Sequence, residues 1–136
     1  MLSRSHRKLE DYADAMIAAL GNLPTARDEL DEALAFFDSS AVNHVADEEM
    51  SLFPHLAPSP LIERLTREHR EQEALLEELK RALREGGDAL SVAERLAAAY
   101  RAHTDLEDRE LLPALDALSP EIRKAVVDDM RARRGR

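Results

Sequence analysis

Hydrophobic residues recur at three- and four-residue spacings along most of the chain, and four clusters of helix-breaking residues interrupt this pattern. The clusters are GNLP at 21–24, PHLAPSP at 54–60, EGGD at 85–88 and SP at 119–120. Short connections between successive helices make neighbours antiparallel. The pattern therefore predicts one all-α domain over residues 1–136: an up-down-up-down antiparallel four-helix bundle over about 3–115, with a short fifth helix over about 119–133.

Residues typical of helix ends lie at the predicted boundaries. Gly21 and Gly86 stand where helix C-caps belong. Thr25 and Ser59 stand before the second and third helices, where a side-chain oxygen can accept from an N–H of the first turn, and Ser119 stands before the fifth.

The apolar stripe of each bundle helix contains one histidine in place of an apolar residue. These are His6, His44, His69 and His103. Residues at equal height in antiparallel helices are symmetric about the turn that joins them, and the positions midway between successive histidines fall in or beside the breaker clusters. The four imidazoles are therefore predicted to form one layer inside the bundle.

A repeated motif adds two carboxylates to this layer. HVADEEMSLFPHL at 44–56 and HTDLEDRELLPAL at 103–115 share His, Glu four residues later, an apolar pair, Pro and Leu. The spacing places His44 with Glu48, and His103 with Glu107, on one helix face each. The segments that begin at His6 and His69 also resemble each other. The chain thus reads as two helical hairpins that together build a symmetric dinuclear site.

The residue types indicate a metal centre without sulfur. Burying imidazoles and carboxylates unpaired would cost several kcal/mol per charge, and a cation removes that cost. The sequence contains no Cys, which excludes disulfides, thiolate sites and Cys nucleophiles. Imidazole and carboxylate suit iron or manganese, with zinc as a further alternative. Glu48 and Glu107, donated from opposite helices, are the natural bridges between two ions.

The charge and the apolar runs exclude several partners. A net charge of −9 argues against nucleic acid or an anionic membrane, and only the final RARRGR is basic. No apolar run is long enough to span a membrane, and the amino terminus lacks the apolar region of a secretory signal. A cytoplasmic protein is expected.

The order of these motifs, H…HxxxE…H…HxxxE, resembles the hemerythrin-like (HHE cation-binding) family from His6 to about Leu115. The resemblance implies a non-haem di-iron centre inside a four-helix bundle. The oxygen-carrying members have a fifth histidine where this chain has Glu73. Their fourth helix uses His with Asp at i+5, so Asp108 stays an alternative to Glu107 as a ligand.

Three further side chains near the layer allow two interpretations each. Glu10 and Glu73 follow His6 and His69 by four residues, which suits either extra ligands or ordinary pairing on a helix surface. Tyr100, one turn before His103, is either a ligand or hydrogen-bond donor at the site, or a core tyrosine. His55 lies between prolines in a turn, off every stripe, and is predicted to be exposed.

Open positions on two metal ions would accept hydrogen peroxide, O2 or NO, which are the expected partners. The first function is that of a di-iron enzyme with catalase-like redox chemistry on peroxide. The alternative is a module that binds or senses oxygen or nitric oxide without turnover, and a metal-free helical interaction protein is the third class. If Glu73 or Glu10 is a metal ligand, its negative charge stabilises the ferric state and disfavours reversible oxygen carriage, which favours the enzyme. The electron donor and any signalling partner cannot be read from the sequence.

Overall fold

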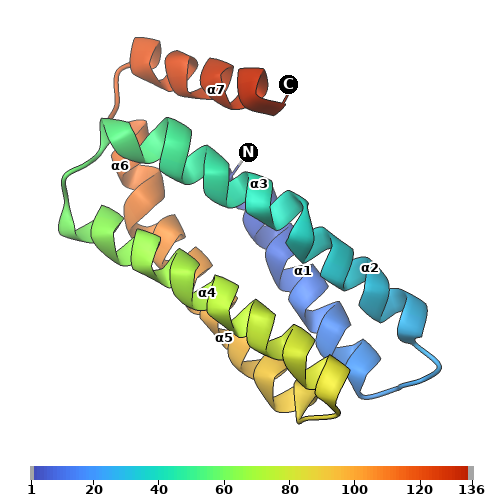
Figure 1. Cartoon of the computed structure of the whole chain (residues 1–136). Helices are drawn as coiled ribbons and strands as arrows, with labels where there is room; N and C mark the ends of the chain where they lie inside the picture. Colours follow the sequence, from blue (N-terminus) through green and yellow to red (C-terminus); the bar gives the residue numbers. More distant parts are fainter. Residues whose placement is uncertain (1, 135–136) are drawn as a thin grey trace.

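The computed structural model describes the backbone of residues 2–134 and the side chains of residues 6–134, and within these residues every regular element is helical (Figure 1). The elements are α1 (Leu2–Leu20), α2 (Arg27–Asp38), α3 (Ser40–Ala46), the π-helical turn η1 (Asp47–Leu52), the 3-10 turn η2 (Phe53–His55), α4 (Pro60–Glu85), α5 (Ala89–Leu106), the π-helical turn η3 (Glu107–Leu111), α6 (Leu112–Asp116) and α7 (Pro120–Arg134). The predicted all-α class is confirmed.

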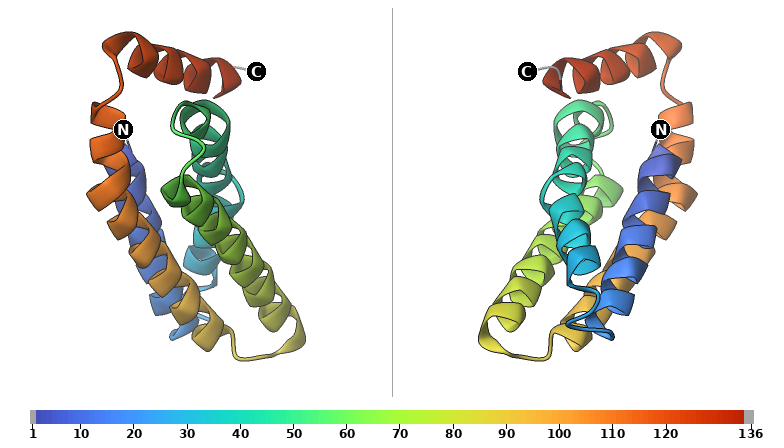
Figure 2. Two further views of the ribbon diagram at one scale, coloured as in Figure 1. Left: turned by 90° about the vertical axis from the view of Figure 1, so that its left-hand side faces the viewer. Right: turned by 90° about the vertical axis from the view of Figure 1, so that its right-hand side faces the viewer.

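The long helices lie alongside one another in a bundle (Figure 2). Helix α1 packs closely against α2 and α5, and α4 packs closely against α5. Contacts of α2 and α3 with α4 are much sparser. The seam between α3 and α4 is therefore the most open side of the bundle.

Most of the predicted helix boundaries are found. Gly86 ends α4 in the left-handed conformation, with φ of 73°, and the N–H of Ile62 donates to Ser59 Oγ at 3.1 Å. The N–H of Ile122 donates to Ser119 Oγ in the same way, and α1 ends at Leu20 as expected.

The predicted cap at Thr25 is wrong. The residue before α2 is Ala26, which makes no side-chain cap hydrogen bond. Backbone carbonyls in the preceding turn satisfy the donors instead, because the N–H groups of Ala26 and Arg27 donate to Asn22 and Pro24. A side-chain acceptor is not needed at this end.

The second predicted helix is broken into α2 and α3 at Ser39. The Ser39 hydroxyl donates to the carbonyl of Ala35 at 2.7 Å, and such back-bonding from a serine bends helices. The break lies one turn before His44 and leaves that residue on the inner face.

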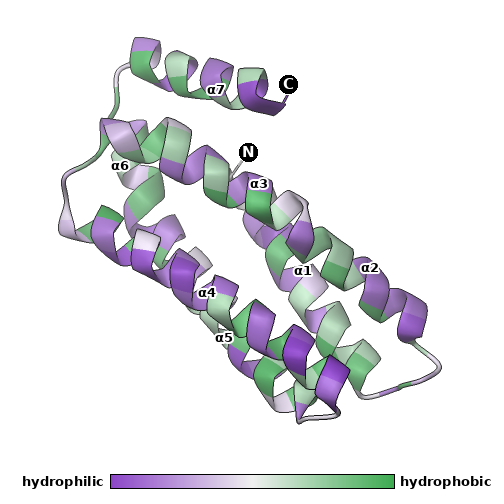
Figure 3. Cartoon of the chain, viewed as in Figure 1, coloured by the Kyte–Doolittle hydropathy of each residue, from purple (hydrophilic) through white to green (hydrophobic). Residues whose placement is uncertain are grey.

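The polar layer lies between two apolar clusters along the bundle. One cluster includes Met16, Phe37, Leu79 and Leu96. The other includes Leu52, Leu65, Leu106 and Leu111. Figure 3 shows both hydrophobic and hydrophilic residues on each helix, as expected of amphipathic helices in a bundle. Water is therefore kept from the layer on both sides.

Helix α7 lies across one end of the bundle, next to the end of α3 and its following turns (Figures 1 and 2). Val126 and Met130 of α7 are buried in the second apolar cluster. Arg133 Nη1 lies 2.7 Å from Asp47 Oδ1, Arg134 also pairs with Asp47, and Ser51 Oγ donates to Asp129 at 2.5 Å. The fifth helix thus closes the end of the bundle that carries η1.

Among the residues described, no helix combines the length and the hydrophobicity that crossing a membrane requires.

Candidate metal centre

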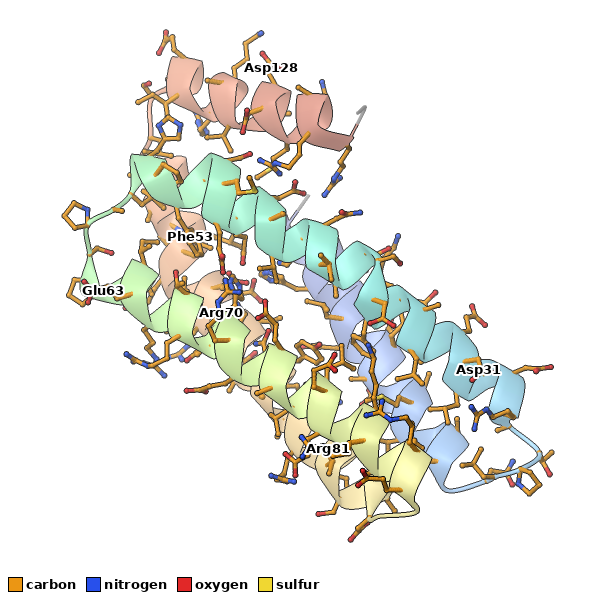
Figure 4. All side chains as sticks on the ribbon, viewed as in Figure 1. Asp31, Phe53, Glu63, Arg70, Arg81 and Asp128 are labelled. Atoms are coloured by element: carbon orange, nitrogen blue, oxygen red, sulfur yellow. The ribbon has the colours of Figure 1, made fainter. Side chains whose placement is uncertain are left out.

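Six buried side chains, each from a different helical element, meet inside the bundle. Each is almost fully buried, and the residues are His6 on α1, His44 on α3, Glu48 in η1, His69 on α4, His103 on α5 and Glu107 in η3. They include every histidine that the sequence placed in the layer, together with both motif glutamates. Figure 4 shows side chains converging between the ribbons close to the labelled Arg70 on α4.

The six residues form two overlapping groups, and the ligand atoms within each group lie within 4.8 Å of one another. One group is His6, His44, Glu48 and Glu107; the other is His69, His103, Glu48 and Glu107. Each group takes both histidines of one hairpin. The two glutamates belong to both groups.

Each glutamate turns one oxygen towards each histidine pair. On one side, His6 Nε2 lies 2.7 Å from Glu107 Oε1, and His44 Nε2 lies 3.5 Å from Glu48 Oε2. On the other side, His69 Nε2 lies 2.9 Å from Glu48 Oε1, and His103 Nε2 lies 3.4 Å from Glu107 Oε2. Each carboxylate is therefore shared between the two histidine pairs.

Most of these atoms have no hydrogen-bond partner within the described part of the chain. Buried atoms of this kind include His6 Nε2, His44 Nε2, His103 Nε2, Glu48 Oε2 and both carboxylate oxygens of Glu107. Although some lie close together, they point at common centres without hydrogen-bond geometry. Leaving so many buried polar atoms unpaired is costly, and cations at the two centres would satisfy all of them.

The two glutamates owe their positions to matching π-helical turns. The N–H of Phe53 donates to the Glu48 carbonyl, and the N–H of Leu112 donates to the Glu107 carbonyl, each five residues back. Pro54 and Pro113 follow directly. Proline has no N–H and clashes with the carbonyl four residues earlier, so a widened turn before it relieves the helix. The shared proline of the repeat thus accounts for the shared turn.

Carboxylates outside the layer hold three of the four imidazoles by Nδ1. Asp108 Oδ1 lies 3.0 Å from His6 Nδ1, Glu49 Oε2 lies 2.6 Å from His69 Nδ1, and Glu68 Oε1 lies 2.8 Å from His103 Nδ1. Such a contact fixes the ring and leaves Nε2 free to bind a metal, while it makes the imidazole more basic.

The second acid of each motif reaches across to the other hairpin. Glu49 follows Glu48 and holds His69, whereas Asp108 follows Glu107 and holds His6. The internal symmetry of the chain therefore extends to the residues behind the site, a pairing that the sequence reading missed although both acid pairs are visible in the repeat.

Two of these supporting acids also contact arginines. Arg70 pairs with Glu49, and Arg64 Nε lies 3.0 Å from Glu68 Oε2. Both supported imidazoles, His69 and His103, belong to the second group. The two groups therefore share the same kinds of inner residue, but the acids paired with arginines lie only behind the histidines of the second group.

The structure places the remaining candidates outside the layer. Asp108 lies behind His6 rather than beside Glu107, and its side chain is 50% exposed. Glu73 is 54% exposed and pairs with Arg70, and Glu10 accepts from the Thr104 hydroxyl at 2.9 Å. Tyr100 is a buried core tyrosine stacked on Phe37, with ring centroids 5.2 Å apart. Burial, and to a smaller extent Asp38 and Glu73, raise the pKa of Tyr100, which keeps it a neutral phenol.

A pocket of about 90 Å³ borders the site on the side of the first apolar cluster, at the open seam between α3 and α4. Histidines of both groups contribute to its wall, namely His44, His69 and His103. Most of the remaining wall is apolar, and its other polar side chains are Gln72, Glu73 and Tyr100. A small molecule in this pocket would lie next to both halves of the site.

The fold and the site define an all-helical protein with a buried histidine and carboxylate cluster. The profile of the hemerythrin HHE cation-binding domain matches residues 1–115, so the chain belongs to this family. No curated protein and no solved structure matches the chain. The match covers α1 to the end of the second motif and leaves α7 outside it. Metal binding follows from the family together with the buried cluster.

Neighbouring charges set the protonation of the cluster when no metal is bound. Burial alone would lower the pKa of His103, but the carboxylates of Glu107 and Glu48 outweigh it and raise the pKa to about 10. The pKa of His6 is also raised, because Glu107 and Asp108 again outweigh the effect of burial, which would lower it. Burial would raise the pKa of Glu48, but the groups around it, Glu107 and three histidines, hold it well below the usual value.

These shifts predict how pH acts on the metal-free protein. A histidine with a raised pKa stabilises the fold fully below its unfolded pKa of about 6.5, and this contribution is lost as the pH approaches about 10. We therefore expect the urea midpoint of metal-free protein to fall between pH 6.5 and 10. Metal-loaded protein, whose imidazoles must be neutral to bind, should not show this loss. If the urea midpoint changed equally with pH in metal-free and metal-loaded protein, the assignment of the histidines as metal ligands would be contradicted.

His55 lies in η2 and is exposed, as the sequence predicted. Because it is remote from the buried groups, His55→Ala should leave the metal content and the visible spectrum unchanged, as measured by metal analysis and absorption. Loss of metal in this variant would show that the cluster does not hold the ions by itself.

Proposed function

We propose that the chain is a non-haem di-iron protein that disproportionates hydrogen peroxide, built as an up-down-up-down four-helix bundle. The observation that carries the proposal is the sharing of Glu48 and Glu107 between two histidine pairs, with one oxygen of each carboxylate on each side. A single-ion site would not need two such groups. The short connections between α1 and α2 and between α4 and α5 support the antiparallel order.

The donor set supports iron. Each group offers two imidazole nitrogens and two carboxylate oxygens and no sulfur, which suits iron, with manganese and zinc as the competing ions. Four protein donors leave further coordination positions free on an octahedral ion, and the neighbouring pocket gives a small ligand access to them.

The surroundings of the site support redox chemistry on peroxide. Two iron ions held here would supply a two-electron couple, which is what converting two molecules of hydrogen peroxide into two of water and one of dioxygen requires. One peroxide molecule is reduced and the other is oxidised, so no external reductant is needed. Asp108, Glu49 and Glu68 make three imidazoles more basic, which favours the higher oxidation state.

The protein itself supplies position and isolation. The Nδ1 contacts fix the imidazoles, and the π-helical turns aim both glutamates inward. The apolar clusters on either side exclude bulk water. The pocket, with a volume of about 90 Å³, suits small molecules.

The alternative function is reversible binding of oxygen or nitric oxide, without turnover. The largely apolar wall of the pocket, including Phe37, Ala41 and Leu76, favours it, because neutral diatomic molecules enter such a space readily. Glu73 pairs with Arg70 at the surface and does not act as a metal ligand, so it favours neither function.

The test is metal analysis followed by peroxide turnover. Protein loaded anaerobically with ferrous iron should contain two ions per chain, and an oxygen electrode should record one dioxygen released for every two peroxide molecules consumed. Metal-stripped protein and free iron at equal concentration are the controls. A stable, reversible oxygen complex in a protein that leaves peroxide intact would replace the enzyme by the binding module.

A further inference from the structure

One buried polar side chain beside the site has a donor atom left unpaired by the described residues and is not part of the metal cluster. Gln72 lies on α4, nearly one turn after His69, and only 6% of it is exposed. Its Nε2 makes no hydrogen bond within the described part of the chain. Of the buried side-chain atoms unpaired there, this is the one that does not belong to the six cluster residues.

The surroundings of Gln72 would suit an apolar residue better. It occupies the inward stripe of α4 between Leu65 and Leu76, where leucine would pack without a polar cost. An unsatisfied buried donor costs about 1–3 kcal/mol. Such a group in a native protein is explained when a ligand supplies the missing acceptor.

Gln72 lines the same pocket as His44, His69 and His103. The wall is otherwise largely apolar, and Glu73 offers an acceptor that already pairs with Arg70. Because Gln72 lines this space and its Nε2 is unpaired, the amide can donate to an atom of a small ligand that also reaches the metal side of the pocket.

We infer that Gln72 is a specificity-determining residue that donates a hydrogen bond from Nε2 to the outer acceptor atom of a small ligand held at this site. The ligand class is a small polar or anionic species with at least two heavy atoms, such as hydrogen peroxide, for which azide is a stable probe. A monatomic anion has no outer atom to accept this hydrogen bond. The inference rests on the proposed function, because it requires metal ions in the cluster.

The experiment compares azide with chloride on iron-loaded, oxidised protein. Wild type, Gln72→Leu, Gln72→Met and the control Leu79→Met, which changes a buried residue of the same helix outside the pocket, are titrated with each anion by visible absorption, after their iron content is measured. We expect both Gln72 variants to bind azide about tenfold more weakly and chloride unchanged. The Leu79 control should bind both anions as wild type does.

Each outcome separates the inference from the proposed function. If wild type holds two irons and binds azide, but the Gln72 variants bind azide equally well, the inference is wrong and the di-iron assignment stands. The inference is also wrong if the variants with intact iron content lose affinity for azide and chloride alike, because the residue then only shapes the pocket. If wild type fails to hold two irons, or binds neither anion, the inference falls, and the iron count alone shows whether the di-iron assignment falls with it.

Discussion

Replacing Glu48 or Glu107 with Ala is expected to remove both metal ions, although each change deletes one side chain. Each glutamate serves both groups of the site, so its loss takes an oxygen donor from each centre at once. The bound metal stabilises the fold by mass action, about 4 kcal/mol when the free metal is about a thousandfold above its dissociation constant. We therefore expect the metal content to fall from two ions to near none and the unfolding midpoint of metal-loaded protein to fall with it.

A histidine variant provides the matched comparison. His44 belongs to one group only, so His44→Ala should weaken binding at one centre and spare the other. Glu85→Ala, an exposed carboxylate at the end of α4, should change neither. Metal analysis at equal free metal, together with urea unfolding, measures both effects. Two ions retained in both glutamate variants would remove these residues as bridges.

The layer itself could be predicted because its signals are periodic. Each histidine replaces an apolar residue on a stripe, and symmetry about the turns fixes the height of each one. The structure brings all four histidines together with Glu48 and Glu107. Helical periodicity identifies which side chains face inward, and this holds even when the exact ends of the helices are not known.

The supporting residues could not be found in this way. Glu68 holds His103, yet on an acid-rich helix surface nothing in its spacing separates it from exposed neighbours such as Glu71. Glu49 and Asp108 could have been noticed in the sequence, because an acidic residue follows the glutamate in both copies of the motif. Their role depends on which hairpin faces which, and this is a tertiary property.

The π-helical turns and the unpaired amide of Gln72 are two further features that could not be predicted from the sequence. Pro54 and Pro113 mark the same place in both motifs, but proline alone does not say whether a helix ends, kinks or widens. Gln72 follows His69 by three residues, so the helix period places it on the same inner face, but only the structure shows that its Nε2 is unpaired beside a pocket.

Helix α7 presents a separate question, because it lies outside the family match and yet contacts the turn that carries Glu48. Asp47, which directly precedes Glu48, is buried and pairs with Arg133 and Arg134. A buried carboxylate that loses its partners costs about 3–5 kcal/mol, and less where the partners are partly exposed, as both arginines are here. Helix α7 therefore helps to hold the turn that carries Glu48 in place.

We expect the double variant Arg133→Ala/Arg134→Ala to lose about 2 kcal/mol of unfolding free energy, because the Asp47 charge stays buried without its cations. Adding Asp47→Asn removes that charge and should restore part of the loss, whereas Asp47→Asn should not raise stability when both arginines are present. Urea unfolding of the four proteins in metal-free form measures this coupling without interference from metal binding. Additive effects across the cycle would mean that the arginines act through some contact other than the one with Asp47. The turn around Glu48 would then be held to α7 by Val126, Met130 and the hydrogen bond from Ser51 to Asp129.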